Sequence, residues 1–226
     1  MTIRVAPALV AVAILCGSAI ADPPARDPEA PPAGLISRDP VRGPAIDPVF
    51  AHLKLDRLGC KFSEEKHVAL LARPLRSTGT IYFDRKRGIA RTTLTPKLQQ
   101  VLLTPTMLRI RKGDRTEEIP LDKSKDLKAF ALIFPTLLRG ERAELERTFE
   151  IGLHGKDTDW WALTFTPKTE SLRKLVRSVV VFGRKGDLVS LQVAEASGDT
   201  TETRLSNILK NGDVPDAEIE AAFGAP

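Results

Sequence analysis

The sequence has few of the residues that enzyme and metal sites require. It contains two cysteines and three histidines, and His52, His67 and His154 are too far apart for the spacing of metal ligands. It has no Gly-x-Ser-x-Gly elbow, no phosphate-binding glycine loop and no His-Glu-x-x-His motif. Neighbours in a strand face opposite sides, so Glu64 and Glu65 cannot form a close acid pair. We therefore expect no catalytic residue, cofactor or metal site, and we expect these polar residues to be solvated.

The sequence also lacks an apolar run of about 20 residues, the length that a membrane-spanning helix needs. The apolar stretch 6–16 is shorter, and Gly17 and Asp22 end it. It follows Arg4 and precedes Ala19-Ile20-Ala21, the pattern of a secretory signal peptide rather than of a retained anchor. We expect residues 1–21 to be a signal peptide cleaved after Ala21, and hence an exported protein.

Two cysteines cannot support a disulfide-rich scaffold. Cys16 lies in the expected signal peptide, and the large Leu15 before it does not fit a lipobox. Cleavage therefore leaves Cys60 alone, and a lone cysteine in an exported protein is most simply a buried apolar residue.

Proline is concentrated rather than scarce: eight of the 17 prolines lie between Pro23 and Pro48. Proline removes amide donors and disfavours helix in the preceding residue. We therefore expect residues 22–48 to be an extended, solvated linker. Its net charge is −2, which leaves about +6 on a folded domain at 49–226.

Within that domain, two-residue periodicity predicts strands. In 77–85, Ile81, Phe83 and Arg85 face one side, and Tyr82 and Asp84 face the other. Turn signals such as Arg87-Gly88, Lys112-Gly113-Asp114, Lys185-Gly186-Asp187 and Ser197-Gly198-Asp199 separate further strands. Two later strands are each predicted to carry apolar residues on one face. These residues are Trp161, Leu163 and Phe165 in the first strand, and Val189, Leu191 and Val193 in the second.

We count ten or eleven strands with few helices. This predicts a mainly β fold with one curved antiparallel sheet, which closes as a barrel or encloses a cavity. Short helices are expected at 48–58, with Phe50, Leu53 and Leu58 on one face, and at 141–147, 170–176 and 215–223.

Helical spacing is clearest between residues 127 and 138. Leu127, Phe130, Phe134 and Leu138 recur at intervals of three and four, and Pro135 should kink this helix or split it in two. An apolar helix of this kind can cover the open face of the sheet as a lid. Its phenylalanines can equally be ordinary core residues.

The positive charge, +5 for the chain, is spread over several turns, and the chain has one tyrosine. This composition lacks the aromatic strand motif of RNA-binding domains, so we expect no nucleic-acid partner. A solvated basic surface explains the charge, and contact with anionic partners or lipid head groups is a sharper alternative.

Arg85 shares its side of the strand with Ile81 and Phe83. An inward-facing guanidinium needs hydrogen-bonded partners, and its five donors could hold a neighbouring helix or loop by its carbonyls. The alternative is that Arg85, at the end of its strand, turns into water.

The order and spacing of several short motifs resemble LolA-like lipoprotein carriers over Phe50–Phe223. They are Phe62-x-x-x-Lys66, Pro74-Leu75-x-Ser77-x-Gly79-x-Ile81-x-Phe83 with Arg85, Trp161-x-Leu163-x-Phe165-x-Pro167, the hairpin Phe182–Asp187 and Gly198-Asp199-x-Thr201. Departures from the family pattern, such as Arg85-Lys86-Arg87 for Arg-Pro-Asn, make the chain similar to a divergent branch.

The resemblance implies an incomplete antiparallel β-barrel with a helical lid over a hydrophobic cavity. It implies a monomeric periplasmic carrier that takes acylated lipoproteins from an inner-membrane donor complex to an outer-membrane receptor, with Arg85 tying the lid shut. The alternatives are a carrier of another lipid or acylated envelope product, or an anchored receptor, which the absent lipobox disfavours. The candidate ligand-binding residues are Ile81, Phe83, Arg85, Phe130, Phe134, Leu138, Trp161, Leu163 and Phe165.

Overall fold

The structure is a computed structural model that describes residues 30–37, 39–155 and 158–224. The expected signal peptide and its cleavage site therefore lie outside the described residues.

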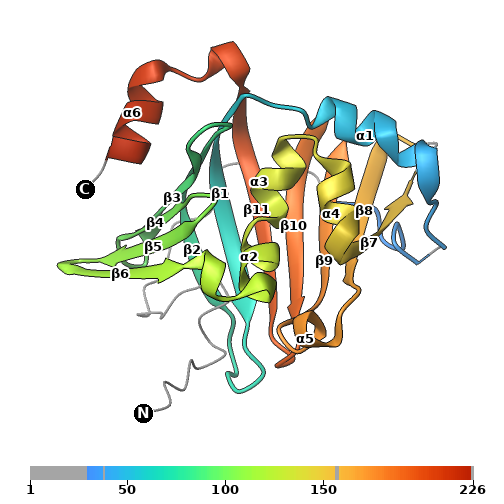
Figure 1. The fold of residues 1–226 in the computed structure, drawn as a ribbon, viewed down its shortest axis with the longest axis horizontal. Helices are drawn as coiled ribbons and strands as arrows, with labels where there is room; N and C mark the ends of the chain where they lie inside the picture. Colours follow the sequence, from blue (N-terminus) through green and yellow to red (C-terminus); the bar gives the residue numbers. More distant parts are fainter. Residues whose placement is uncertain (1–29, 38, 156–157, 225–226) are drawn as a thin grey trace.

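In this part of the chain, eleven strands form one antiparallel sheet (Figure 1) in the order β6-β5-β4-β3-β2-β1-β11-β10-β9-β8-β7. The strands are β1 (Arg57–His67), β2 (Leu75–Asp84), β3 (Gly88–Thr95), β4 (Gln99–Leu103), β5 (Met107–Lys112), β6 (Arg115–Pro120), β7 (Phe149–His154), β8 (Trp160–Pro167), β9 (Val176–Arg184), β10 (Asp187–Glu195) and β11 (Thr200–Lys210). The sheet stays open, with β6 and β7 at its two edges. The mainly β, incomplete barrel is thus confirmed.

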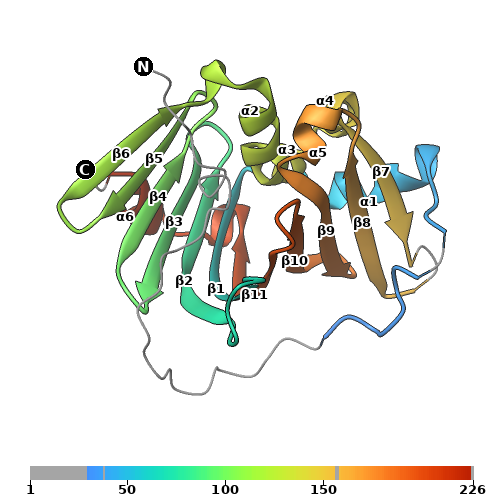
Figure 2. The ribbon, with the colours of Figure 1, turned by 90° about the horizontal axis from the view of Figure 1, so that it is seen from below.

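Short helices complete the fold. They are the 3₁₀ turns η2 (Gly43–Ile46), η3 (Leu121–Lys123) and η4 (Asn211–Asp213), and the α-helices α1 (Asp47–His52), α2 (Lys125–Ala131), α3 (Ile133–Leu138), α4 (Arg142–Thr148), α5 (Glu170–Arg173) and α6 (Asp216–Gly224). Figure 2 shows the sheet curving into a trough, with α2 and α3 lying across its open side.

The helical segment 127–138 is split into α2 and α3, as its proline predicts. Ser124 caps α2 by accepting a hydrogen bond from the amide of Leu127, and the helix breaks at Leu132. Pro135 lies in the first turn of α3 and has no amide to donate to the carbonyl of Ala131, four residues earlier. The lid is therefore two short helices joined at Leu132.

The concave face of the sheet carries the main core. Apolar residues from β1, β2, β8 and β9 pack there with those of α1, α3 and α4. A smaller cluster, Ala162, Val180 and Phe182, lies on the opposite face and is covered by Leu35. Tyr82 also faces away from the main core, and its hydroxyl donates to Glu218 of α6. Helix α6 therefore packs on the convex side of β2 and β3.

Two local expectations are wrong. Leu58 is buried with Phe50 and Leu53, but it belongs to β1 because α1 ends at His52. Val189 does not share a face with Leu191 and Val193. A β-bulge between Leu188 and Ser190 shifts the register of β10 against β9, and one extra residue reverses the facing of those that follow.

The described part of the proline-rich segment contacts the sheet. Val41 forms a β-bridge with Leu153 at the edge strand β7, and Ile46 is fully buried. The segment therefore contacts the fold at Val41 and Ile46, while most of its described side chains, including that of Val41, stay exposed. The domain boundaries at residues 21 and 48 stay predictions.

Candidate functional site

A cavity of about 190 Å³ lies between the concave face and the lid helices α2 and α3. Its walls are mostly apolar. The sheet contributes Ile81, Ile89, Val101, Leu191 and Val193, and the lid contributes Phe130, Ala131, Ile133 and Phe134. This apolar lining, aliphatic on the sheet side, is suited to hydrocarbon chains, which gain about 0.8 kcal/mol for each CH₂ removed from water.

The structure brings three of the predicted residues to this cavity, namely Ile81, Phe130 and Phe134. The other apolar candidates are buried in the surrounding core: Phe83, Leu138, Trp161, Leu163 and Phe165. Those on β8 are covered by packed side chains, including the edge-to-face contact between Phe165 and Phe149 with ring centroids 6.3 Å apart. Residues that face the concave side are part of the core. Among these candidates, those that line the cavity lie on or beneath α2 and α3.

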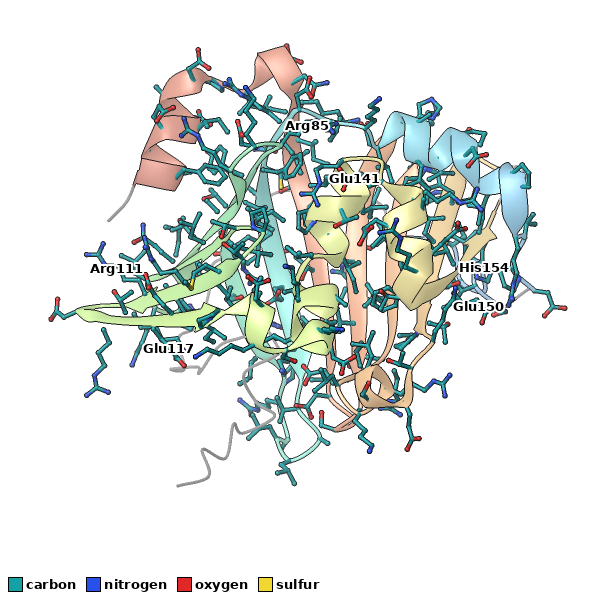
Figure 3. The ribbon with its side chains drawn as sticks, viewed as in Figure 1. Arg85, Arg111, Glu117, Glu141, Glu150 and His154 are labelled. Atoms are coloured by element: carbon teal, nitrogen blue, oxygen red, sulfur yellow. The ribbon has the colours of Figure 1, made fainter. Side chains whose placement is uncertain are left out.

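Arg85 lies at the end of β2 beside the C-terminal end of α3 (Figure 3). Its Nη2 donates to the carbonyl of Leu55 at 2.7 Å, and its Nη1 to the carbonyl of Arg139 at 3.4 Å. Its Nε donates to Asp56 Oδ1 at 2.8 Å. The guanidinium thus holds backbone carbonyls of neighbouring elements, and it does not line the cavity.

Leu55 connects this arginine to the lid a second time. The amide of Leu55 donates to the carbonyl of Leu138, the last residue of α3, at 2.8 Å. Gly140 follows with a φ of +71°, and a Cβ there would lie 3.1 Å from the carbonyl oxygen of Phe50. The end of α3 is therefore fixed closely to α1 and to the loop after it.

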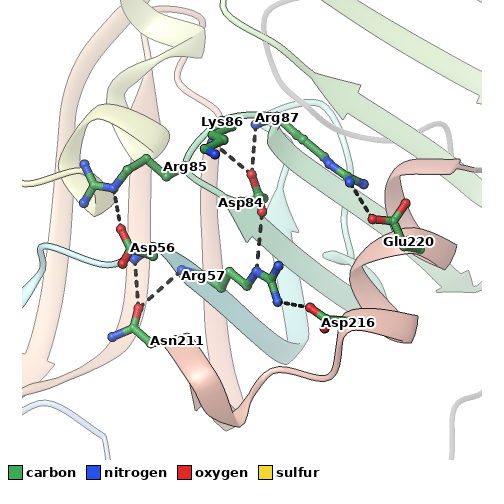
Figure 4. Close-up of polar contacts among 9 residues, drawn as sticks. All are labelled: Asp56, Arg57, Asp84, Arg85, Lys86, Arg87, Asn211, Asp216 and Glu220. Atoms are coloured by element: carbon green, nitrogen blue, oxygen red, sulfur yellow. Dashed lines mark hydrogen bonds and ion pairs between the residues drawn. The ribbon is translucent and has the colours of Figure 1, made fainter.

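Figure 4 shows how the Arg85 contacts continue across the surface. Asn211 Oδ1 accepts the backbone amides of Asp56 and Arg57, at 2.8 and 3.3 Å. The side chain of Arg57 pairs with Asp84 at 3.5 Å and with Asp216 of α6. This polar network joins α6, the ends of β1 and β2, and the end of the lid.

The floor of the cavity carries a buried ion pair between Arg91 and Glu64. Both Nη atoms of Arg91 donate to Glu64, each at 2.9 Å. The Glu64 side chain is 2% exposed, and its Oε2 also accepts the hydroxyl of Thr203 at 2.7 Å. The Arg91 guanidinium lies 4.1 Å from the centre of the Phe62 ring. Glu64 is therefore satisfied and inward-facing, and the expectation of a solvated Glu64 is wrong.

The sequence does hold a signal for this placement. Glu64 and Lys66 have the same parity as Cys60 and Phe62 in β1, so they share the concave face. Lys66 is buried and pairs with Glu195 at 2.8 Å. A charged side chain can face inward when it has a partner of opposite sign, as Glu64 and Lys66 do here.

Among the other polar candidates, His154 is also buried, contrary to expectation, and lies 3.4 Å from the Thr164 hydroxyl. Glu65 is solvent-accessible and pairs with Arg76 and His67, and His52 is exposed. Over the described ranges, no group of three or more metal-ligating side chains comes together, and no helix is both long and apolar enough to cross a membrane.

Cys60 is buried on the concave face of β1, as expected for a small apolar residue. Burial raises the pKa of its thiol to about 12, and the backbone hydrogen bond involving Ile81 opposes this only in part. A neutral, enclosed thiol is a poor nucleophile, so Cys60 is a core residue and not a reactive one.

Comparison with known proteins places these features in a family. The family model described as "Outer membrane lipoprotein carrier protein LolA-like" matches residues 46–223. No curated protein sequence matches the chain.

Among solved structures, a LolA superfamily protein from Nitrosomonas europaea is 13% identical, with a TM-score of 0.41, covering 75% of this chain and 94% of that one. A DUF1329 family protein from Desulfovibrio piger is 13% identical, with a TM-score of 0.44, covering 82% and 100%. The lipoprotein LppX of Mycobacterium tuberculosis is 11% identical, with a TM-score of 0.43, covering 77% and 99%. Because the family model spans most of the sequence, the chain belongs to the LolA-like family of outer membrane lipoprotein carrier proteins.

Proposed function

We propose that this protein is a periplasmic carrier that holds the acyl chains of lipoproteins beneath α2 and α3 and delivers them towards the outer membrane. The observation that carries the proposal is the apolar cavity between the concave face and the lid. Family membership supports the lipoprotein cargo. An inner-membrane donor complex and an outer-membrane receptor are the partners that such a route requires.

The size of the cavity indicates that the lid must move. A cavity of about 150 Å³ holds one benzene molecule, and the space here is about 190 Å³. A chain of roughly 16 carbons, whose burial is worth on the order of 10 kcal/mol, does not fit into it. Cargo binding therefore requires α2 and α3 to move away from the sheet.

The contacts of Arg85 provide the resistance to that movement. They hold the carbonyl of Arg139 directly and that of Leu138 through Leu55. Hydrogen bonds from a charged donor contribute about 1.5–3 kcal/mol each, which offsets part of the gain from acyl burial. A carrier needs this balance, because cargo that is held by the full burial energy is not released.

Native mass spectrometry of protein isolated from the periplasm tests the proposal. The protein is co-expressed with a lipoprotein, and in parallel with the same lipoprotein lacking its acylated cysteine. We expect a complex with the acylated form and none with the unacylated form. If neither form nor any lipid is bound, the carrier function is wrong.

Lipid extraction from the same sample distinguishes lipoprotein from the alternative cargo. A bound glycolipid or another acylated envelope product, in place of lipoprotein, would keep the carrier role and replace its substrate.

A further inference from the structure

The cavity is apolar except along one stretch of its floor, where polar side chains form two adjacent rows across the sheet. In the first row, Leu191, Thr203, Glu64 and Ser77 are direct cross-strand neighbours on β10, β11, β1 and β2. In the second row, Val193, Thr201, Lys66 and Leu75 are neighbours in the same way. Direct cross-strand neighbours share one face of a sheet, so these polar groups lie together at one end of the cavity. Glu64, Thr201 and Thr203 line the cavity itself, and Lys66 and Ser77 lie next to them on the sheet.

This polar end costs free energy if the cavity holds hydrocarbon alone. Replacing a buried ion pair with apolar residues of similar volume is often neutral or even stabilising. Here the Glu64–Arg91 pair lies against the cavity, where leucine or methionine would extend the aliphatic wall. The ion pair and its polar neighbours can form hydrogen bonds with a polar group of a ligand at this end, which apolar residues cannot do.

Among the polar residues that line this end of the cavity, the unused hydrogen-bonding sites are mainly acceptors. Arg91 already donates two hydrogen bonds to Glu64, and Lys66 donates to Glu195. A carboxylate has about four acceptor sites, and the described hydrogen bonds use three on Glu64 and one on Glu195. The hydroxyl of Thr201, which can accept or donate a hydrogen bond, also lies at the cavity wall.

The charges at this end do not favour an anion. Both cations are paired with carboxylates, and Asp199 adds a third carboxylate 3.9 Å from Lys66. A phosphate would have to displace Glu64 from Arg91 or approach Glu195 and Asp199, and like charges that are partly buried repel strongly.

We propose that the polar end of the cavity binds the neutral, hydrogen-bond-donating head group of an acylated cargo, a hydroxyl or an amide N–H, and rejects an anionic phosphate head group. This inference rests on the proposed carrier function and names the chemistry that the carrier recognises beyond the acyl chains. An acylglycerol hydroxyl and an N-acyl amide share that chemistry.

Three soluble lipids with identical chains test it: 1,2-dioctanoylglycerol, its 3-acetate and 1,2-dioctanoylphosphatidic acid. Each competes with the neutral apolar dye Nile red for the purified protein. We expect the glycerol to bind about fivefold to tenfold more tightly than the acetate, which lacks only the hydroxyl donor. Phosphatidic acid should bind more weakly than either neutral lipid.

Two substitutions locate the discrimination. Glu195→Gln removes one carboxylate and should raise the affinity for phosphatidic acid, and Thr201→Val should reduce the preference for the glycerol over its acetate. Thr166→Val, on the exposed face of β8, is the matched control and should change neither ratio.

Equal binding of the three lipids, or tighter binding of phosphatidic acid, would overturn the head-group assignment and leave the carrier function intact. If no lipid displaces Nile red, the carrier function itself fails, and the head-group assignment fails with it. The N-acyl amide is tested in the same way, with N-octanoylglycinamide compared with octanoate.

Discussion

Arg85 donates a 2.7 Å hydrogen bond to the carbonyl of Leu55, whose own amide donates to Leu138 at the end of α3. The guanidinium of Arg85 thus fixes the C-terminal end of the lid indirectly, through the backbone of Leu55. Both contacts end on main-chain atoms, so the link depends on the arginine and on the path of the chain, and not on the identity of the lid side chains.

Arg85→Leu should loosen the end of the lid. The variant loses hydrogen bonds to the carbonyls of Leu55 and Arg139. Because the bond to Arg139 is long, at 3.4 Å, and the Arg85 side chain is 30% exposed, the total loss of stability should be about 1–3 kcal/mol. Hydrogen exchange of the amides in 133–140 should rise more than exchange in β8 or β9. Arg87→Leu is the matched control, because Arg87 pairs with Glu220 of α6 and does not contact the lid. Unchanged exchange at 133–140 would contradict the latch.

Filling the cavity should remove ligand binding without unfolding the protein. Val193→Phe places a ring in the cavity at a cost of about 1–3 kcal/mol from overpacking, and affinity for an apolar dye should fall at least about tenfold. Val189→Phe in the same strand is the control, since Val189 lies outside the cavity lining and outside the main core. If both variants bind the dye equally, the dye binds elsewhere.

The Glu64–Arg91 pair should show strong non-additivity in stability. Either Glu64→Leu or Arg91→Met leaves a buried charge without its partner and should cost about 3–5 kcal/mol. The double variant should recover most of that loss, because neither charge remains. The exposed pair Arg109–Glu118, at 2.7 Å, should contribute less than about 1 kcal/mol. Urea unfolding of the four chains measures the coupling, and simple additivity would show that the pair is not buried in solution.

Cys60 should make the protein less stable at high pH. Its pKa is 9.0 in the reference state and about 12 when folded, because burial favours the neutral thiol. The contribution is fully present below pH 9 and is lost as the pH rises from 9 towards 12.

The free energy of unfolding should therefore decline more steeply above pH 9 in the native sequence than in Cys60→Ala. Alkylation by iodoacetamide at pH 9 should be slow until the protein is unfolded. Parallel stability profiles for the two chains, or rapid alkylation of the folded protein, would contradict the burial of the thiol.

Much of the fold can be predicted from the sequence because its strands alternate and its hairpins carry short turn signals. The alternation of Ile81 and Phe83 with Tyr82 indicates which side chains of the strand face the core. The turn at Lys185-Gly186 indicates where one strand connects to the next. The split of the lid was predictable for the same reason, since Pro135 removes a specific amide from a helix.

Other features depend on contacts that the local sequence does not encode. The central pairing of β1 with β11 joins Glu64 to Thr203, and nothing near either residue indicates the other. In the sequence, Val189, Leu191 and Val193 alternate as they would in a regular strand. The bulge before Ser190 changes which of them face the core. Part of the cavity lining follows from local patterns in the sequence. Phe130 and Phe134 follow from helical spacing, but the ion pair requires knowing that Arg91 lies within reach of Glu64.

Photo-crosslinking from inside the cavity tests the central claim most directly. Benzoylphenylalanine replaces Phe130 or Phe134 on the lid, and Phe223 on α6 as a control, in protein co-expressed with a radiolabelled acylated lipoprotein. The account predicts cross-links to the acyl chains from Phe130 and Phe134 and none from Phe223. Absence of cross-links from both lid positions, or equal labelling from Phe223, would contradict a carrier that holds acyl chains beneath its lid.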